Sequence, residues 1–144
     1  MTNTNEYVEA FKKSKQDELD SPDGRVRLRL LAEFLLGLPK ERFDLRQWWS
    51  DGFQPHECGT TACACGWACV IFPGLSRTNS QPSLTNEPLD CHLKYGWWAM
   101  EKFFDLNEDW AYEFFLDSRY GVNPAPSEVS DKIFSYLERT NNGN

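Results

Sequence analysis

The feature that most constrains the fold is a segment of small residues between positions 60 and 72. Its small members are Ala62, Cys63, Ala64, Cys65, Gly66, Ala68 and Cys69. Trp67 is the one large exception. A helix with small side chains all round lets neighbouring backbones approach closely and offers water no polar face. The segment lacks the period-two alternation of a half-buried strand. We therefore predict a central helix at about 60–72, packed on all sides.

Helical periodicity continues on both sides of this segment. In the amino-terminal half, apolar residues recur four apart from Val26 to Leu38, which is the spacing of one helix face. Ser21 precedes Pro22 and Asp23, a pattern typical of a helix start, and Gly37 and Pro39 end the helix. Further helices are expected over 43–49, 93–104, 107–120 and from 127 onward. Together these patterns predict an all-α fold, a compact bundle of five or six helices in a single domain over 1–144.

Three segments are expected to lie outside the main packing. Residues 1–20 have few apolar side chains, so we expect a loosely attached N-terminal helix there. Residues 73–90 are polar and rich in proline, which predicts a long polar loop. A structureless loop longer than about 12–15 residues is uncommon in a compact domain, so this one is either mobile or functional. The tail at 140–144 is expected to fray.

Charge excludes two classes of partner. The chain has 15 Lys and Arg against 22 Asp and Glu, a net charge of −7. Nucleic acids and anionic membranes are bound by basic patches, so we expect neither as a partner. No stretch approaches the about 18 consecutive apolar residues of a membrane helix, and residues 1–7 do not begin a secretory signal. We therefore expect a cytoplasmic protein with reduced thiols, and its five cysteines do not suggest a disulfide framework.

The segment that precedes and begins the small helix carries a resemblance to known proteins. Residues 58–68 read Cys-Gly-Thr-Thr-Ala-Cys-Ala-Cys-Gly-Trp-Ala. They resemble the Cys-Gly-Thr-x-Ala-Cys-x-x-Gly-Trp-Ala motif of a family of small, uncharacterised bacterial and phage proteins. Residues 42–48 and 103–106 resemble further blocks of that family, with Leu45 in place of Met and Cys65 in place of a small apolar residue. The resemblance implies a helical domain associated with mobile elements, and it carries no established activity.

The cysteines and histidines permit three interpretations. Cys63, Cys65 and Cys69 behave as small hydrophobic residues if the helix is buried. A zinc site would use His56, Cys58, Cys63, Cys91 and His92. Its candidate ligand pairs are Cys58-x4-Cys63 and the adjacent Cys91–His92, and adjacent residues rarely both bind one ion. A cysteine hydrolase would use Cys58 as the nucleophile and His92 as the base, but no side chain that would orient the histidine stands out. We favour burial, which requires no cofactor, and keep the other two as alternatives.

Two tryptophan doublets are the candidate partner-binding residues. Adjacent residues of a helix point about 100° apart, so both members of Trp48–Trp49 or Trp97–Trp98 cannot enter one core. An exposed Trp is enriched at protein interfaces. Asp109, Glu113 and Asp117 also recur four apart, and we interpret this acidic row as the solvated edge of a helix. The sequence thus favours a small acidic protein that acts through a protein partner rather than an enzyme.

Overall fold

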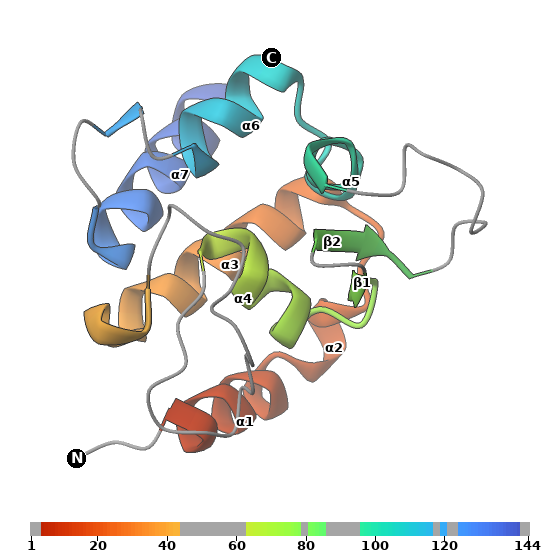
Figure 1. The fold of residues 1–144 in the computed structure, drawn as a ribbon, viewed down its shortest axis with the longest axis vertical. Coiled ribbons are helices and arrows are strands. Elements are labelled where there is room, and N and C mark those ends of the chain that lie inside the picture. Colours follow the sequence, from red (N-terminus) through yellow and green to blue (C-terminus); the bar gives the residue numbers. More distant parts are fainter. Residues whose placement is uncertain are drawn as a thin grey trace.

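The computed structural model confirms an all-helical architecture with one small hairpin (Figure 1). It describes residues 4–43, 63–78, 81–85, 96–116, 119–120 and 124–141, so the helix expected over 43–49 lies almost entirely outside the described residues. The elements, in order, are α1 (Thr4–Ser14), α2 (Gln16–Leu19), α3 (Gly24–Gly37), the 3₁₀ turn η1 (Lys40–Arg42), α4 (Ala64–Ile71), β1 (Leu75–Thr78), β2 (Gln81–Leu84), α5 (Gly96–Phe104), α6 (Glu108–Phe115) and α7 (Pro126–Asn141). In the described part of the chain, no helix is long and apolar enough to span a membrane.

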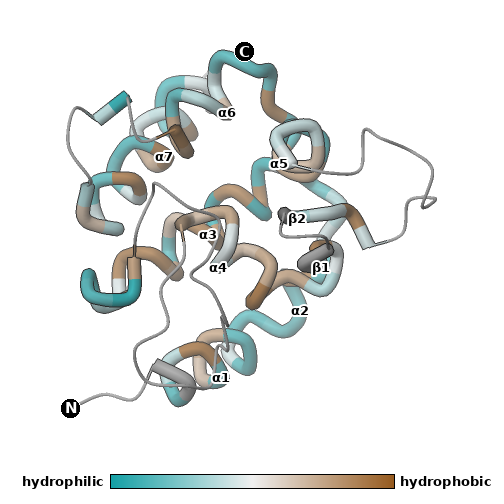
Figure 2. The backbone as a smooth tube through the Cα atoms, in the orientation of Figure 1, coloured by the Kyte–Doolittle hydropathy of each residue, from teal (hydrophilic) through white to brown (hydrophobic). Residues whose placement is uncertain are grey.

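Helix α3 runs through the middle of the bundle and packs against α2, α4, α5 and α7 (Figure 1). It begins two residues later than the sequence suggested, because Asp23 rather than Ser21 is its N-cap. The Asp23 side chain accepts a hydrogen bond from the Arg25 N–H at 2.9 Å, which satisfies one of the unpaired donors of a helix start. The helix ends at Gly37, ahead of Pro39, as predicted. Figure 2 shows hydrophobic residues concentrated along α3 and α4.

Helix α4 confirms the prediction of a buried small-residue helix. Ala64, Cys65, Trp67 and Ala68 are fully buried. The Trp67 indole N–H donates to the Arg42 carbonyl at 2.8 Å, so the one large side chain is accommodated without an unsatisfied donor. The helix is not covered on every side, because Cys69 and Val70 are partly exposed. The described helix starts at Ala64, and positions 60–62 of the predicted span lie outside the described residues.

The N-terminal segment packs more firmly than the expectation of a loosely attached helix, which needs correction. Val8 on α1 and Leu19 on α2 are 2% and 7% exposed. The Tyr7 hydroxyl donates to the Phe34 carbonyl of α3, and the Tyr7 and Phe34 rings lie 5.1 Å apart. The sequence pattern understated this attachment, because an aromatic cluster and a hydrogen bond, rather than a long apolar stripe, hold α1 against α3.

Part of the expected long polar loop is a β-hairpin, and the interpretation of 73–90 as a loop was wrong there. Strands β1 and β2 pair antiparallel, with Leu75 opposite Leu84 and Ser76 opposite Ser83. Leu75, Ser83 and Leu84 are buried, because the hairpin packs against α4 and α5. Pro82 lies within β2. Proline has no N–H to donate to a neighbouring strand, and an edge strand tolerates it because one side of the strand needs no such donor. Residues 79–80 and 86–90 lie outside the described residues.

Helices α5, α6 and α7 complete the fold on the other side of α3 from α1 (Figure 1). Asn107 caps α6, as predicted, by accepting from the Trp110 N–H at 2.9 Å. Helix α7 begins at Pro126, one residue before the expected cap at Ser127. The buried Ser130 hydroxyl donates to the Ala32 carbonyl at 2.7 Å and so joins α7 to α3. Helix α7 extends to Asn141, and only 142–144 of the tail lie outside the described residues.

Candidate binding groove between α6 and α7

Most of the sequence-predicted site residues fall outside the described residues. These are Trp48, Trp49, His56, Cys58, Cys91 and His92. The proposed zinc set and the Cys58–His92 pair therefore stay predictions. Within the described residues, no group of three or more His, Cys, Asp or Glu side chains is arranged to hold a metal ion. Cys63, Trp97 and Trp98 are the candidates that the structure places.

Cys63 is the N-cap of α4. Its Sγ accepts from the Gly66 N–H at 3.4 Å, and the side chain is 2% exposed. Burial by itself raises the pKa of the Cys63 thiol, but hydrogen bonds from the Cys65 thiol and the Gly66 N–H outweigh it, so that this pKa lies below the usual value. The lowered pKa thus belongs to a buried thiol, and burial restricts its access to a substrate.

The other two cysteines of α4 have different environments. Burial and the neighbouring Cys63 raise the pKa of the Cys65 thiol well above its usual value, which makes it an inert core residue. The partly exposed Cys69 thiol donates to the Ser76 carbonyl at 3.5 Å and so contacts the hairpin. Both observations agree with the interpretation of these cysteines as packing residues.

The Trp97–Trp98 doublet divides in the way that helix geometry predicts. Trp97 packs edge-on against Tyr112, with ring centroids 5.0 Å apart. Trp98 is 52% exposed on α5. One indole thus covers the seam between α5 and α6, while the other presents much of its surface to solvent. Trp98 stays a candidate for contact with a partner.

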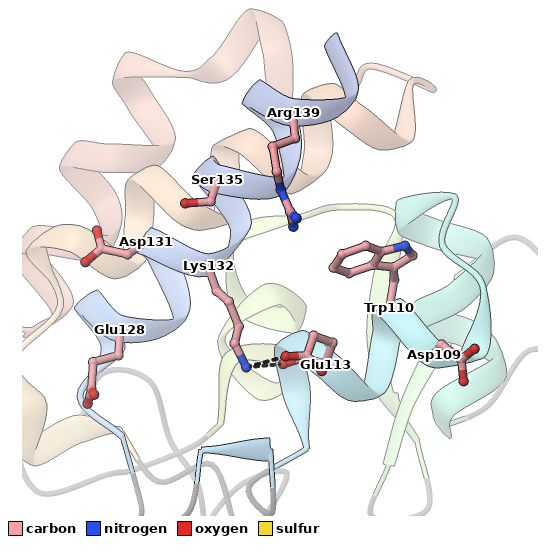
Figure 3. Close-up of a pocket in the computed structure, with 8 residues that line it drawn as sticks. All are labelled: Asp109, Trp110, Glu113, Glu128, Asp131, Lys132, Ser135 and Arg139. Atoms are coloured by element: carbon pink, nitrogen blue, oxygen red, sulfur yellow. Dashed lines mark hydrogen bonds and ion pairs between the residues drawn. The ribbon is translucent and has the colours of Figure 1, made fainter. Parts of the chain in front are cut away.

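A groove of ligand size lies between α6 and α7 (Figure 3). Its volume is about 570 Å³, which is within the range of about 300–1,000 Å³ typical of ligand pockets. Its walls come from one face of each helix, and the lining residues are Asp109, Trp110, Glu113, Glu128, Asp131, Lys132, Ser135 and Arg139. In Figure 3 the side chains of Lys132 and Arg139 reach from α7 toward the side where Glu113 and Trp110 project from α6.

Lys132 is fixed by contacts on three sides. Its Nζ lies 2.8 Å from the Glu113 carboxylate and donates to the Glu113 carbonyl at 3.0 Å. It also lies 3.9 Å from the centroid of the Tyr120 ring. An ammonium group held by a carboxylate, a carbonyl and an aromatic face has little left to offer a ligand. Lys132 therefore joins the two walls and neutralises one of the four carboxylates.

Trp110 forms the apolar part of the groove. Its ring stacks on Phe114 at 5.5 Å and lies 4.5 Å from the Tyr136 ring, which holds the indole from the core side. The Arg139 guanidinium carbon lies 5.7 Å from the centroid of the same indole. The groove thus presents an aromatic face to a cation, at the distance where the ring quadrupole attracts positive charge.

The groove is acidic overall. Four lining carboxylates against two cations leave a formal charge of −2. The pKa of the Tyr120 hydroxyl is raised, mainly by burial and then by the negative charges of Glu113 and Glu128. The negative charge of Glu113 acts on the Tyr120 hydroxyl although Lys132 pairs with the same carboxylate. The site is therefore suited to positive charge with an apolar or planar portion that can lie on Trp110.

The sequence analysis missed this groove. It interpreted Asp109 and Glu113 as a solvated helix edge, and Asp117 lies outside the described residues. The missing signal was on α7, where Lys132 and Arg139 occupy the face that meets α6. A search for one aromatic residue within an acidic row, matched to basic residues on a neighbouring helix, would have proposed the site.

Comparison with known proteins does not identify a relative. No family model, no curated protein and no solved structure matches the chain.

Proposed function

We propose that this protein is a binding module whose α6–α7 groove takes a basic segment of a partner protein. The observation that carries the proposal is the position of Trp110 among carboxylates in an open groove of about 570 Å³. An aromatic face beside acidic side chains attracts a cation and also covers its apolar stem.

Charge complementarity selects the occupant. The groove has a formal charge of −2 and the chain a net charge of −7, so a basic segment is steered toward it, whereas an acidic ligand is repelled. The groove is open along the two helices rather than enclosed (Figure 3), which suits an extended peptide. If the resemblance of residues 58–68 to phage and bacterial proteins holds, a host protein is a reasonable source of that segment.

The test measures binding of a short fluorescent peptide in which Gly and Arg alternate, with a Gly–Glu peptide of the same length as the control. Fluorescence anisotropy at low salt should show binding of the basic peptide alone, and added salt should weaken it because the charges are exposed. Equal binding of the acidic peptide, or no binding of either, would contradict the proposal.

Substitutions then locate the site. Asp131 is exposed in the groove and Asp17 is exposed on α2, away from α6 and α7 (Figure 1). Asp131→Asn should weaken binding about two- to fivefold, the range of one exposed charge pair, whereas Asp17→Asn should have a smaller effect. Trp98→Ala provides a second comparison. Loss of binding in that variant, with Asp131→Asn unchanged, would move the binding site to α5.

A further inference from the structure

Arg139 is the one cation in the groove whose charge is not paired. Its side chain is exposed, and among the described residues it forms no ion pair, although Asp109, Glu113 and Asp131 line the same groove. Its contact is with the indole of Trp110, 5.7 Å from the guanidinium carbon to the ring centroid. Figure 3 shows the Arg139 side chain extending from the last turns of α7 toward this ring. A guanidinium group therefore already stands where the groove offers its aromatic face.

We propose that Arg139 occupies, in the free protein, the position over Trp110 that an arginine of the basic partner takes in the complex. This inference rests on the proposed function and adds two statements to it, the identity of the side chain recognised and the residue that must move aside. The occupant is expected to be arginine rather than lysine, because a planar guanidinium stacks on an indole and pairs with carboxylates in a fork that a compact ammonium group cannot match.

The exchange favours the partner because Arg139 forms no ion pair with Asp109 or Asp131 among the described residues. An arginine on an extended peptide approaches across the groove, where Asp109 and Asp131 lie on opposite walls. Lys132 cannot take the place of Arg139, since it is held by Glu113 and the Tyr120 ring. When Arg139 swings out of the groove, a positive charge also leaves the site, and the groove becomes more acidic as the ligand enters.

The experiment compares the Gly–Arg peptide with a Gly–Lys peptide on three proteins: wild type, Arg139→Gln, and Lys13→Gln as the matched charge control. Lys13 is an exposed cation on α1, which lies on the opposite side of the bundle from α6 and α7 (Figure 1). Both variants raise the net negative charge by one, but only Arg139→Gln removes the guanidinium group from the Trp110 ring. Arg139→Gln should bind the Gly–Arg peptide about two- to fivefold more tightly than wild type, with a smaller gain for the Gly–Lys peptide and for Lys13→Gln.

Nuclear magnetic resonance supplies a second readout. In the free protein the side-chain protons of Arg139 should show a ring-current shift from Trp110, and this shift should diminish when the Gly–Arg peptide is added to wild type. Equal gains in Arg139→Gln and Lys13→Gln, or an Arg139 shift that persists at saturation, would overturn the inference and leave the proposed function intact. Weaker binding in Arg139→Gln would also overturn it, because Arg139 would then belong to the binding surface. Failure of every protein to bind either basic peptide would refute the proposed function itself.

Discussion

Lys132 and Arg139 make a matched pair for testing how the groove is held together. Both are cations of α7 that line the same groove. Lys132 forms an ion pair and a hydrogen bond with Glu113 on the opposite wall, whereas Arg139 contacts that wall only through the Trp110 ring. We predict that Lys132→Met destabilises the fold by about 1–2 kcal/mol, whereas Arg139→Met costs less than about 0.5 kcal/mol. Methionine keeps an unbranched apolar stem of similar length in both cases, so the comparison isolates the charged group.

The magnitude follows from the contacts of Lys132. The side chains of the Lys132–Glu113 pair are 28% and 37% exposed, so solvent screening limits the ion pair to about 0.2–1 kcal/mol. The hydrogen bond to the Glu113 carbonyl, 3.0 Å long, contributes about 1 kcal/mol. The Tyr120 ring, 3.9 Å from Nζ, contributes about 0.5–1 kcal/mol at an exposed site. These contributions share one ammonium group and are not fully additive, so the expected total of about 1–2 kcal/mol lies below their sum.

The measurement is urea denaturation followed by circular dichroism, with the slope required to stay constant so that a shift in midpoint reports stability. A cycle with Glu113→Gln isolates the ion pair, whose coupling energy should be about 0.5 kcal/mol. If the two methionine variants unfold at the same midpoint, Lys132 does not clamp α6 to α7 and the account of the groove wall is wrong.

Three further predictions concern the core and its response to pH. A Cβ on Gly24 would lie 2.6 Å from the Phe104 carbonyl carbon, which is backbone, whereas a Cβ on Gly37 would meet the far end of the Tyr7 side chain. Gly24→Ala should therefore lower the thermal midpoint by several degrees, and more than Gly37→Ala. Ala64→Leu should cost about 1–3 kcal/mol by overpacking the start of α4, and an unchanged denaturation midpoint would show that this side is open. The pKa of Tyr120 in the folded state is raised above 10.0. The free energy of unfolding should therefore be unaffected by this group below pH 10 and should fall as the pH rises toward the folded-state pKa, by up to about 1.4 kcal/mol per pH unit. Tyr120→Phe should make this alkaline fall in stability shallower.

Local residue pattern alone determined several parts of this protein. The small side chains around Trp67 required an interior helix, since such a helix has no face that water can solvate. Asn107 marked the start of α6, because a side-chain acceptor there satisfies an N–H that the helix leaves unpaired. The angle between adjacent helix residues predicted that Trp97 and Trp98 would separate, and Trp98 is the exposed member.

Tertiary contacts decided the parts that the pattern understated. The hairpin forms because Leu75 and Leu84 face each other and are buried against α4 and α5, and neither short strand carries enough alternation to be recognised alone. Helix α1 is attached through Tyr7 and the Phe34 carbonyl, a contact that joins residues 27 positions apart.

The groove depended most on tertiary structure. Trp110 on α6 contacts Arg139 on α7, and Glu113, further along α6, contacts Lys132, which comes earlier on α7. The two helices are therefore antiparallel at the groove, and the contacts join residues about twenty to thirty positions apart. Each helix alone shows only charged residues on a wet face. Side-chain periodicity reports which face of a helix meets water, but it carries no information on which other helix lies across from that face, and the chemistry of a groove belongs to the pair.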